Sequence, residues 1–263
     1  MEFFKLRSGG RMPALGYGTF LATGIELEKS LNIALETGYR CFDTAVGYNN
    51  ESIIGKVLNE WISAGKVTRE ELFVITKKME EQVVNGRTKS IGLSNFNIKQ
   101  IQRILDNCKI RPDSLQNENH LYFQAPEVVQ FCKINDIVLI SYSSLGMKSF
   151  RELMAISWNN KQLPEMLEND VLVKVAKKHG KTPAQALLRF INQNGMSVIP
   201  KSTTPERIVE NFQIFDFKLD TKDMDALRNL DEGEGGRIVR FTMIKKFDAV
   251  GDEGLDVEFD ELE

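Results

Sequence analysis

Three polar residues have types and spacing that could carry out acid–base chemistry. Asp43 ends the stretch CFD, Tyr48 follows five residues later in AVGYNNE, and Lys77 follows FVIT. A lysine ammonium stabilises a neighbouring phenolate and lowers the tyrosine pKa, while a carboxylate keeps the lysine charged and oriented. A tyrosine tuned in this way can donate a proton to a carbonyl oxygen near neutral pH. Each residue also has a structural interpretation: Asp43 capping a turn, Tyr48 packing on a rim and Lys77 lying in solvent.

The elements that would position these residues are short β-type runs that alternate with amphipathic helical patterns. Such alternation is typical of βα units around a parallel sheet, with active-site residues at the carboxyl ends of the strands. We therefore predict an α/β fold, a single TIM-barrel domain over residues 1–263 with a tail from about residue 232 to 263. A closed (β/α)8 barrel needs eight strands. The sequence predicts seven: Ala14–Gly18, Arg40–Asp43, Phe73–Thr76, Ser90–Leu93, Ser114–Asn117, Val138–Tyr142 and Ser197–Pro200.

A second candidate site lies in the stretch SVIPKSTTPERIVEN near the end of the chain. Thr204 and Pro205 are typical of an N-cap followed by proline at the first helical position, as are Thr182 and Pro183. The loop after the last barrel strand and the following helix N-terminus often bind phosphate in this fold. Lys201 and Arg207 add two cations, which suits a 2′-phosphate. The alternative is an ordinary capped helix with a solvated basic face.

Composition and charge exclude several other classes of protein. No apolar run approaches the roughly 18 residues of a membrane span, and the net charge of −3 comes from interspersed acids and bases without a basic, nucleic-acid-binding face. A Rossmann site is disfavoured because Gly16-Tyr17-Gly18 lacks the third glycine of the fingerprint. The three cysteines are widely spaced and predict reduced thiols in a cytoplasmic protein, with no metal site.

Six stretches together resemble a known family. In order they are FDTAVGYNNE, FVITK, IGLSNFN, ENHLYF, LISYSSLG and IPKSTTPERIVEN, and they are similar to the signature stretches of the aldo-keto reductase superfamily. The resemblance runs from about Leu15 to Leu230. It implies a (β/α)8 barrel that binds NADPH in extended form and reduces small aldehydes and ketones. It also implies a monomer without nucleic-acid or membrane partners.

The resemblance also assigns roles to individual residues. Asp43, Tyr48 and Lys77 match three members of the family's catalytic tetrad. The positions that hold the nicotinamide carboxamide, stack on its ring and line the pyrophosphate are matched by Ser94, Asn95, Gln116, Tyr142, Ser143 and Leu145. The positions of the adenosine and 2′-phosphate site are matched by Lys201, Ser202, Arg207, Glu210 and Asn211.

The fourth tetrad member is a histidine, and the strand that carries it in the family is absent between Lys77 and Ser94. Relative to the family layout, roughly 65 residues are missing, including one βα unit of the barrel. The chain has two histidines, His120 and His179, and neither matches the catalytic position. With both flanks intact, the gap resembles a skipped exon or a truncated gene model.

Two functions follow from this pattern. The first is an NADPH-dependent carbonyl reductase that uses Tyr48 as proton donor and is weakened by the missing histidine. The second is a non-catalytic NADPH-binding protein or a destabilised splice-type variant, because the cofactor residues after the gap are all present. The sequence does not identify the carbonyl substrate.

Overall fold

Seven parallel strands form the centre of the molecule in the computed structural model, which describes residues 2–75, 85–86, 88–147 and 163–239. All seven predicted strands are present, with boundaries that differ by a few residues. They pair in the orders β3-β4-β5 and β6-β7-β8-β9. Their bounds are β3 Tyr17–Gly18, β4 Cys41–Asp43, β5 Phe73–Ile75, β6 Gly92–Ser94, β7 Ser114–Glu118, β8 Val138–Tyr142 and β9 Met196–Val198.

The two groups of strands join where the chain before β3 runs beside β9. The Val198 amide donates to the Ala14 carbonyl at 3.1 Å, and the Gly16 amide donates to the Val198 carbonyl at 2.8 Å. Leu15 and Val198 form a parallel bridge between these bonds. The strand order around the molecule is therefore β5-β4-β3-β9-β8-β7-β6.

This ring of strands is open, and β5 and β6 are the strands on the two sides of the opening. Among the described residues, β5 pairs only with β4, and β6 pairs only with β7. The strands at this opening are also less buried: β4 and β9 are buried throughout, whereas Gly92 and Ser94 of β6 are exposed. The predicted seven-strand barrel with one missing unit agrees with this arrangement.

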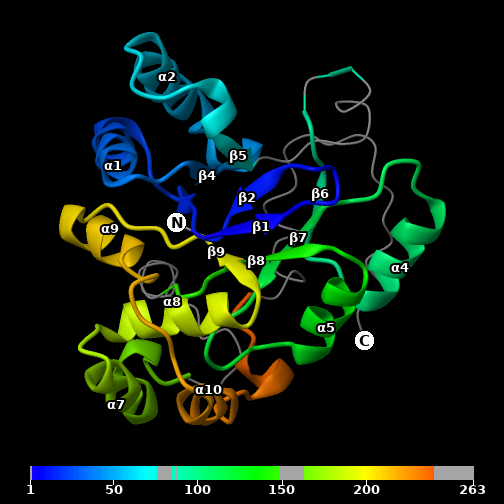
Figure 1. Cartoon of the computed structure of the whole chain (residues 1–263), viewed down its shortest axis with the longest axis vertical. Coiled ribbons are helices and arrows are strands. Elements are labelled where there is room, and N and C mark those ends of the chain that lie inside the picture. Colours follow the sequence, from blue (N-terminus) through cyan, green and yellow to red (C-terminus); the bar gives the residue numbers. More distant parts are fainter. Residues whose placement is uncertain (1, 76–84, 87, 148–162, 240–263) are drawn as a thin grey trace.

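An N-terminal hairpin, β1 Phe3–Lys5 and β2 Arg11–Pro13, covers one end of the strands and was not predicted from the sequence. In Figure 1 it crosses in front of the parallel strands. Met12 of the hairpin and the adjoining Leu6 pack with Ile140 and Ile199 in a small separate core. Burying these apolar side chains stabilises the fold by roughly 1.5–3 kcal/mol each.

Helices surround the strands on the outside (Figure 1). Apolar residues at helical spacing face inward, as in α1, where Leu27, Leu31 and Leu35 are buried. The same helix ends at Gly38, which has a φ of 113° that a side chain would strain. The helices are α1 Gly24–Thr37, α2 Glu51–Ser63, α4 Ile98–Asn107, α5 Pro126–Ile134, α7 Asp170–Lys178, α8 Pro183–Gln193, α9 Pro205–Phe212 and α10 Thr221–Arg228, with short 3-10 turns η1 Val46–Tyr48, η2 Arg69–Glu71, η3 Met166–Glu168 and η4 Gly233–Gly236.

The two proline-containing helix starts differ in their caps. The Thr182 hydroxyl accepts from the Gln185 amide, and the Gln185 side chain reaches back to the Thr182 amide, which completes a capping box at α8. The prediction of an N-cap there is confirmed. Thr204 occupies the N-cap position of α9 but makes no capping bond with its side chain. Its amide donates instead to the Ser202 hydroxyl at 3.1 Å.

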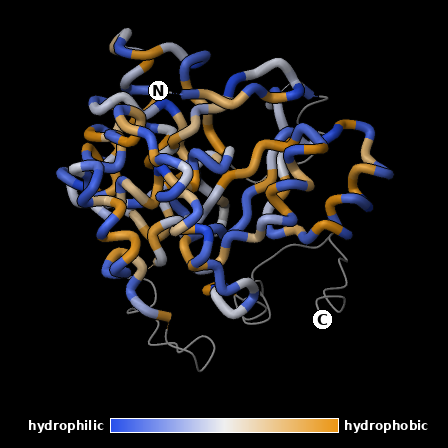
Figure 2. The backbone as a smooth tube through the Cα atoms, turned by 60° about the horizontal axis from the view of Figure 1, so that its bottom comes forward, coloured by the Kyte–Doolittle hydropathy of each residue, from blue (hydrophilic) through white to orange (hydrophobic). Residues whose placement is uncertain are grey.

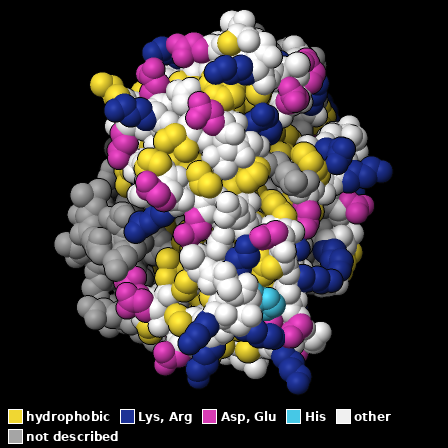
Figure 3. Space-filling model, turned by 60° about the vertical axis from the view of Figure 1, so that its left-hand side comes forward, with side chains coloured by type: hydrophobic (Ala, Val, Ile, Leu, Met, Phe, Trp, Pro, Cys, Tyr) yellow, Lys and Arg dark blue, Asp and Glu magenta, His cyan; other side chains and the backbone are white. Residues whose placement is uncertain are grey.

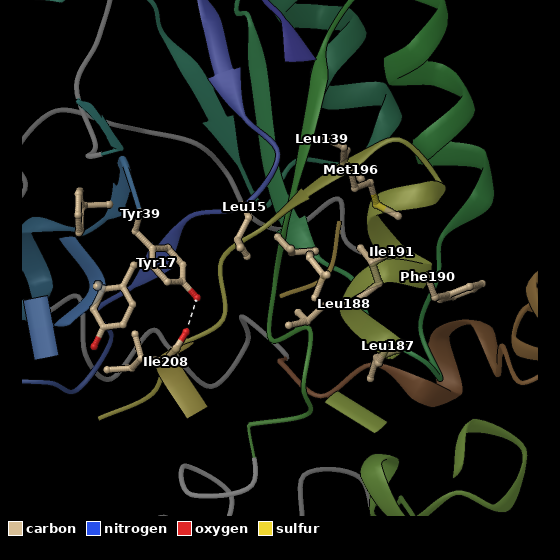
Figure 4. Packing of buried hydrophobic residues seen from close by; sticks show 14 of the residues in the cluster. Leu15, Tyr17, Tyr39, Leu139, Leu187, Leu188, Phe190, Ile191, Met196 and Ile208 are labelled. Atoms are coloured by element: carbon tan, nitrogen blue, oxygen red, sulfur yellow. Dashed lines mark hydrogen bonds between the residues drawn. The ribbon is translucent and has the colours of Figure 1, made fainter. Parts of the chain in front are cut away.

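One large core lies between the strands and the outer helices. Figure 4 shows Leu187, Leu188 and Ile191 of α8 in the same buried cluster as Leu139 of β8 and Leu15, which precedes β3. The same view shows the Tyr39 hydroxyl donating to the Ile208 carbonyl of α9 at 3.0 Å. The tube in Figure 2 alternates between hydrophobic and hydrophilic stretches along the helices, as expected when one face of each is buried.

The surface shows no concentration of one charge on the face seen in Figure 3, where acidic and basic side chains are interspersed. Among the described helices, none is long and apolar enough to cross a membrane.

Candidate active site

The predicted site residues on the strands lie at the same end of the sheet. Asp43 ends β4, Ser94 ends β6 and Tyr142 ends β8. Gln116 on β7 lies opposite Ser94 in the parallel register. Since the strands are parallel, these residues gather at their carboxyl ends, where barrel enzymes place their chemistry.

Asp43 is buried at this end, with 5% of its surface exposed. Its Oδ1 accepts from the Gln116 Nε2 at 2.7 Å. Burial raises the pKa of Asp43 to about 7, while the Gln116 hydrogen bond opposes the rise. Because β4 and β7 are not sheet neighbours, this bond directly connects a predicted catalytic residue with a predicted nicotinamide residue across the strand ends.

Tyr48 lies on η1, five residues after β4, and its ring packs edge-to-face on Phe20 with centroids 5.1 Å apart. Burial, followed by the nearby Asp43 charge, raises the pKa of Tyr48 above its ordinary value. The phenol is therefore protonated at neutral pH and can serve as a proton donor. The sequence predicts a lowered pKa from Lys77, which lies outside the described residues; the described neighbours act in the opposite direction.

Asn50 holds the Tyr48 loop in place, a role that the sequence analysis missed. Its side chain is fully buried. The side-chain nitrogen Nδ2 of Asn50 donates to the carbonyls of Thr19 and Ala22, both at 3.0 Å. Its side-chain oxygen Oδ1 accepts from the Thr44 hydroxyl at 2.8 Å. These bonds tie the loop after β3 to the loop after β4. The only sequence signal was an asparagine before a helix, and its side chain does not cap that helix.

The residues predicted to hold the nicotinamide carboxamide form one group on β6 and β7. The Asn95 amide donates to the Gln116 carbonyl at 3.0 Å and to the Asn117 side chain at 2.8 Å. The Asn95 side chain donates to the Ser94 hydroxyl at 3.1 Å. Ser94 and Asn95 are exposed, as expected for a strand at the opening of the ring.

Tyr142 and Ser143 present hydroxyl groups that have no hydrogen-bond partner among the described residues. Both hydroxyl oxygens are buried and make no hydrogen bond within the part of the chain that the structure describes. Burial also raises the pKa of Tyr142. Ser143 begins a tight turn with a φ of 55°, closed by the Gly146 amide, and Leu145 on that turn is half-buried. Buried unpaired hydroxyls are costly unless a ligand satisfies them, so this turn fits a pyrophosphate group.

The second candidate site surrounds the start of α9. Lys201 and Arg207 are exposed, and neither forms an ion pair with any other described residue. Ser202 is buried, and its carbonyl accepts from the Tyr17 hydroxyl, which fixes the loop against β3. Two cations beside a helix N-terminus fit a phosphate group.

The last two predicted adenosine residues lie on the inner side of α9. Asn211 is buried. Glu210 is half-buried, and its Oε1 accepts from the Thr182 hydroxyl at 2.8 Å. In this structure Glu210 therefore ties α9 to α8 through one oxygen.

Stability should depend on pH through Asp43. Because its folded pKa is raised from 3.8 to about 7, its stabilising contribution is fully present below pH 3.8 and is lost as the pH rises through 7. At pH 8 Asp43→Asn should be more stable than the native chain, by up to about 4 kcal/mol, and the difference should vanish below about pH 4. Urea unfolding at pH 4, 6 and 8 measures this. A less stable variant at pH 8 would show that a cation outside the described residues neutralises Asp43.

Comparison with known proteins identifies the family. The sequence profile of the Aldo/keto reductase family matches residues 14–83 and 77–232, which together span most of the chain. The chain belongs to the aldo/keto reductase family. Dihydrodiol dehydrogenase 3 of Bos taurus is 32% identical, and the match covers 86% of this chain and 90% of that protein. NAD(P)H-dependent D-xylose reductase I,II of Candida tropicalis is 31% identical over 87% of this chain and 92% of the yeast protein.

Solved aldo-keto reductase structures confirm the predicted fold. A crystal structure of an aldo-keto reductase complexed with NADPH matches with a TM-score of 0.83 at 31% identity, covering 97% of this chain and 94% of that one. The silkworm (Bombyx mori) enzyme matches with a TM-score of 0.82. The family and the barrel type that the six sequence stretches predicted are confirmed, and with them the prediction of an oxidoreductase.

Proposed function

We propose that this aldo-keto reductase reduces small aldehydes or ketones with NADPH and uses Tyr48 as the proton donor. The observation that carries the proposal is the gathering of Asp43, Tyr48, Gln116 and Tyr142 at the carboxyl ends of the strands. The hydroxyls of Tyr142 and Ser143, which have no partner within the described part of the chain, and the cations near α9 support cofactor binding along the same edge. The NAD(P)H-dependent xylose reductase among the relatives and the NADPH-complexed structural neighbour agree with this cofactor.

Bound NADPH would supply the hydride, and side chains of this protein would hold the cofactor and supply the proton. Ser94, Asn95 and Gln116 would hold the carboxamide, and Tyr142 would orient the ring by stacking on it. The Tyr48 hydroxyl holds a proton at the position of the carbonyl oxygen. Since burial and Asp43 both disfavour a Tyr48 anion, proton transfer needs a stabilising cation. Lys77 is the residue proposed for that role.

Gln116 has two competing partners in this mechanism. In the structure its Nε2 donates to Asp43 at 2.7 Å. A carboxamide bound by this nitrogen would replace that bond and leave the buried Asp43 carboxylate without it. Cofactor binding and the charge state of Asp43 are therefore coupled through Gln116.

We also infer an internal deletion in this chain. The alignment with the bovine relative runs over 297 residues, although 86% of the 263 residues here is only about 226. The family profile matches in two segments, which overlap over residues 77–83. The open strands β5 and β6 flank the same stretch of the sequence. A skipped exon or truncated gene model explains these observations, and comparing the transcript with its genomic locus tests it.

The deletion leaves the site without its histidine. His120 is fully buried against Glu118, and the His179 ring nitrogen lies 2.8 Å from the carboxylate of Asp223 on α10. Neither histidine lies at the Tyr48 hydroxyl. Loss of one oxyanion-type donor costs about 10²–10³ in kcat, so we expect weak turnover.

The second candidate function is NADPH binding without catalysis. It is supported by the same opening between β5 and β6, because the cofactor residues after the gap are retained while the tetrad is incomplete. Titration of NADPH fluorescence distinguishes a folded binder from an unfolded chain. Loss of NADPH absorbance that depends on an added aldehyde then distinguishes an enzyme from a binder. Monomeric state and cytoplasmic location remain predictions.

Arg207→Ala should weaken NADPH binding selectively. Arg207 is exposed beside the start of α9, where it can pair with the extra phosphate of NADPH. Removing one charge-assisted contact should raise the NADPH Kd by about 10-fold or more and leave the NADH Kd nearly unchanged. Fluorescence titration with each cofactor measures both constants. Arg103→Ala, which changes another exposed arginine, on α4, is the matched control. Equal losses for both cofactors would contradict the assignment.

A further inference from the structure

Glu118, at the end of β7, has a carboxylate that accepts three hydrogen bonds in the interior. His120 lies 2.8 Å from its Oε1, and both side chains are completely buried. The backbone amides of Ile238 and Val239 also donate to this carboxylate, the second at 2.8 Å. The Glu118 side chain therefore holds the backbone of residues that follow it by about 120 positions in the sequence.

The arrangement of donors indicates the tautomer of His120. Its Nδ1 accepts from the Tyr122 amide at 3.3 Å and therefore carries no proton. The Nε2 then carries the hydrogen and donates to Glu118. A neutral imidazole and two backbone amides thus surround the carboxylate, and these hydrogen bonds compensate for its burial.

Residues 232–239 dock on the same loop. The Glu232 amide donates to the Tyr122 carbonyl at 2.9 Å. Gly236 approaches so closely that a Cβ there would lie 1.8 Å from the Tyr122 carbonyl oxygen. The Arg237 guanidinium lies 4.1 Å from the centre of the Phe123 ring. Residues 232–239 therefore fit one specific position against residues 118–123.

This docked segment lies beside the proposed nicotinamide site. Glu118 on β7 is opposite Tyr142 on β8 in the parallel register. Burial is the largest cause of the raised pKa of Tyr142. The nearby charge of Glu118 raises this pKa further, and the charge of Arg237 lowers it. Ile238 and Val239 are buried in the main core, which Tyr142 also contacts. The segment therefore forms part of the packing that sets the position of the Tyr142 ring.

We propose that Glu118 is a positioning residue, which anchors residues 237–239 and thereby holds Tyr142 in place for the nicotinamide ring. The proposal rests on the proposed function of NADPH binding. The anchor is specific to a carboxylate because one group must accept from two amides and an imidazole at once. A glutamine at position 118 keeps the shape but presents only one accepting oxygen.

The test combines amide exchange with cofactor binding in the full chain. In Glu118→Gln, the amides of Ile238 and Val239 should exchange at least about 10-fold faster, measured by mass spectrometry. NADPH should bind about threefold to tenfold more weakly, the range that a misplaced aromatic contact predicts. Gly236→Ala displaces the segment without altering Glu118 and should produce both effects. Glu71→Gln is the matched control, because the Glu71 carboxylate on η2 likewise accepts from a backbone amide, that of Thr68. This variant should change neither amide exchange at Ile238 and Val239 nor NADPH binding.

The outcomes separate the two proposals. If the native chain binds NADPH and Glu118→Gln binds it equally well, the positioning role is wrong and the proposed function stands. Unchanged exchange at Ile238 and Val239 in this variant also overturns the positioning role. If the native chain does not bind NADPH, the proposed function fails and the positioning role fails with it. Weaker binding in both anchor variants, with Glu71→Gln unchanged, supports the inference.

Discussion

Tyr48→Phe is expected to abolish carbonyl reduction by this chain. Phenylalanine keeps the ring that packs on Phe20 and removes only the hydroxyl that carries the transferable proton. The histidine that could act as a second donor in the family is absent, so little residual proton transfer should remain. General acid catalysis contributes about 10²–10⁴-fold, and a rate already weakened by the gap should fall below detection. Loss of NADPH absorbance with excess aldehyde measures the rate.

The matched control for this prediction is Tyr39→Phe. Tyr39 is buried and precedes β4 at its amino end, and its hydroxyl donates to the Ile208 carbonyl. Removing it should cost about 1 kcal/mol of stability through one lost hydrogen bond and leave reduction unchanged. NADPH binding should survive Tyr48→Phe, because the nicotinamide residues are elsewhere. Full activity in Tyr48→Phe would mean that the proton comes from another group.

Restoring the barrel unit that we infer to be missing should increase carbonyl reduction. Inserting a relative's strand-and-helix segment between Lys77 and Met79, which lie outside the described residues, would place a strand between β5 and β6. Pairing both open edges removes the cost of unpaired backbone groups and lets strand number, tilt and stagger agree. We expect a cooperative melt at higher temperature together with a gain of at least about 10²-fold in turnover.

The size of this gain follows from geometry as well as from the histidine. Asp43 lies on one side of the opening and Ser94 and Gln116 on the other. A displacement of about 1 Å between reacting groups can cost about 10²-fold in rate. Circular dichroism melts and aldehyde reduction should therefore improve together. The same insert with its catalytic histidine replaced by alanine separates the two effects, since it should restore the melt without the full rate. A native chain that already melts cooperatively and turns over at the rate of complete relatives would contradict the prediction.

The sequence by itself determined the features that depend on neighbours in the chain. Seven β-type runs predicted seven strands, and polar residues after them predicted a site at the carboxyl ends. Thr182 and Pro183 predicted the start of α8, where the capping box is observed. Helix periodicity, capping and strand alternation are local patterns, so they can be read without knowing how the sheet closes.

The tertiary structure alone decided the contacts between distant residues. The bond from Gln116 to Asp43 joins residues 73 positions apart, and Glu118 binds the backbone of Ile238 and Val239 about 120 positions further along. The sequence indicates a helix start at Asn50, whereas in the structure its side chain connects the loops after β3 and β4 by hydrogen bonds. Local patterns say which end of a strand a residue occupies; only closure of the sheet sets the distances between strand ends. Those distances determine which hydrogen bonds form, which carboxylates are buried and how their pKa values shift.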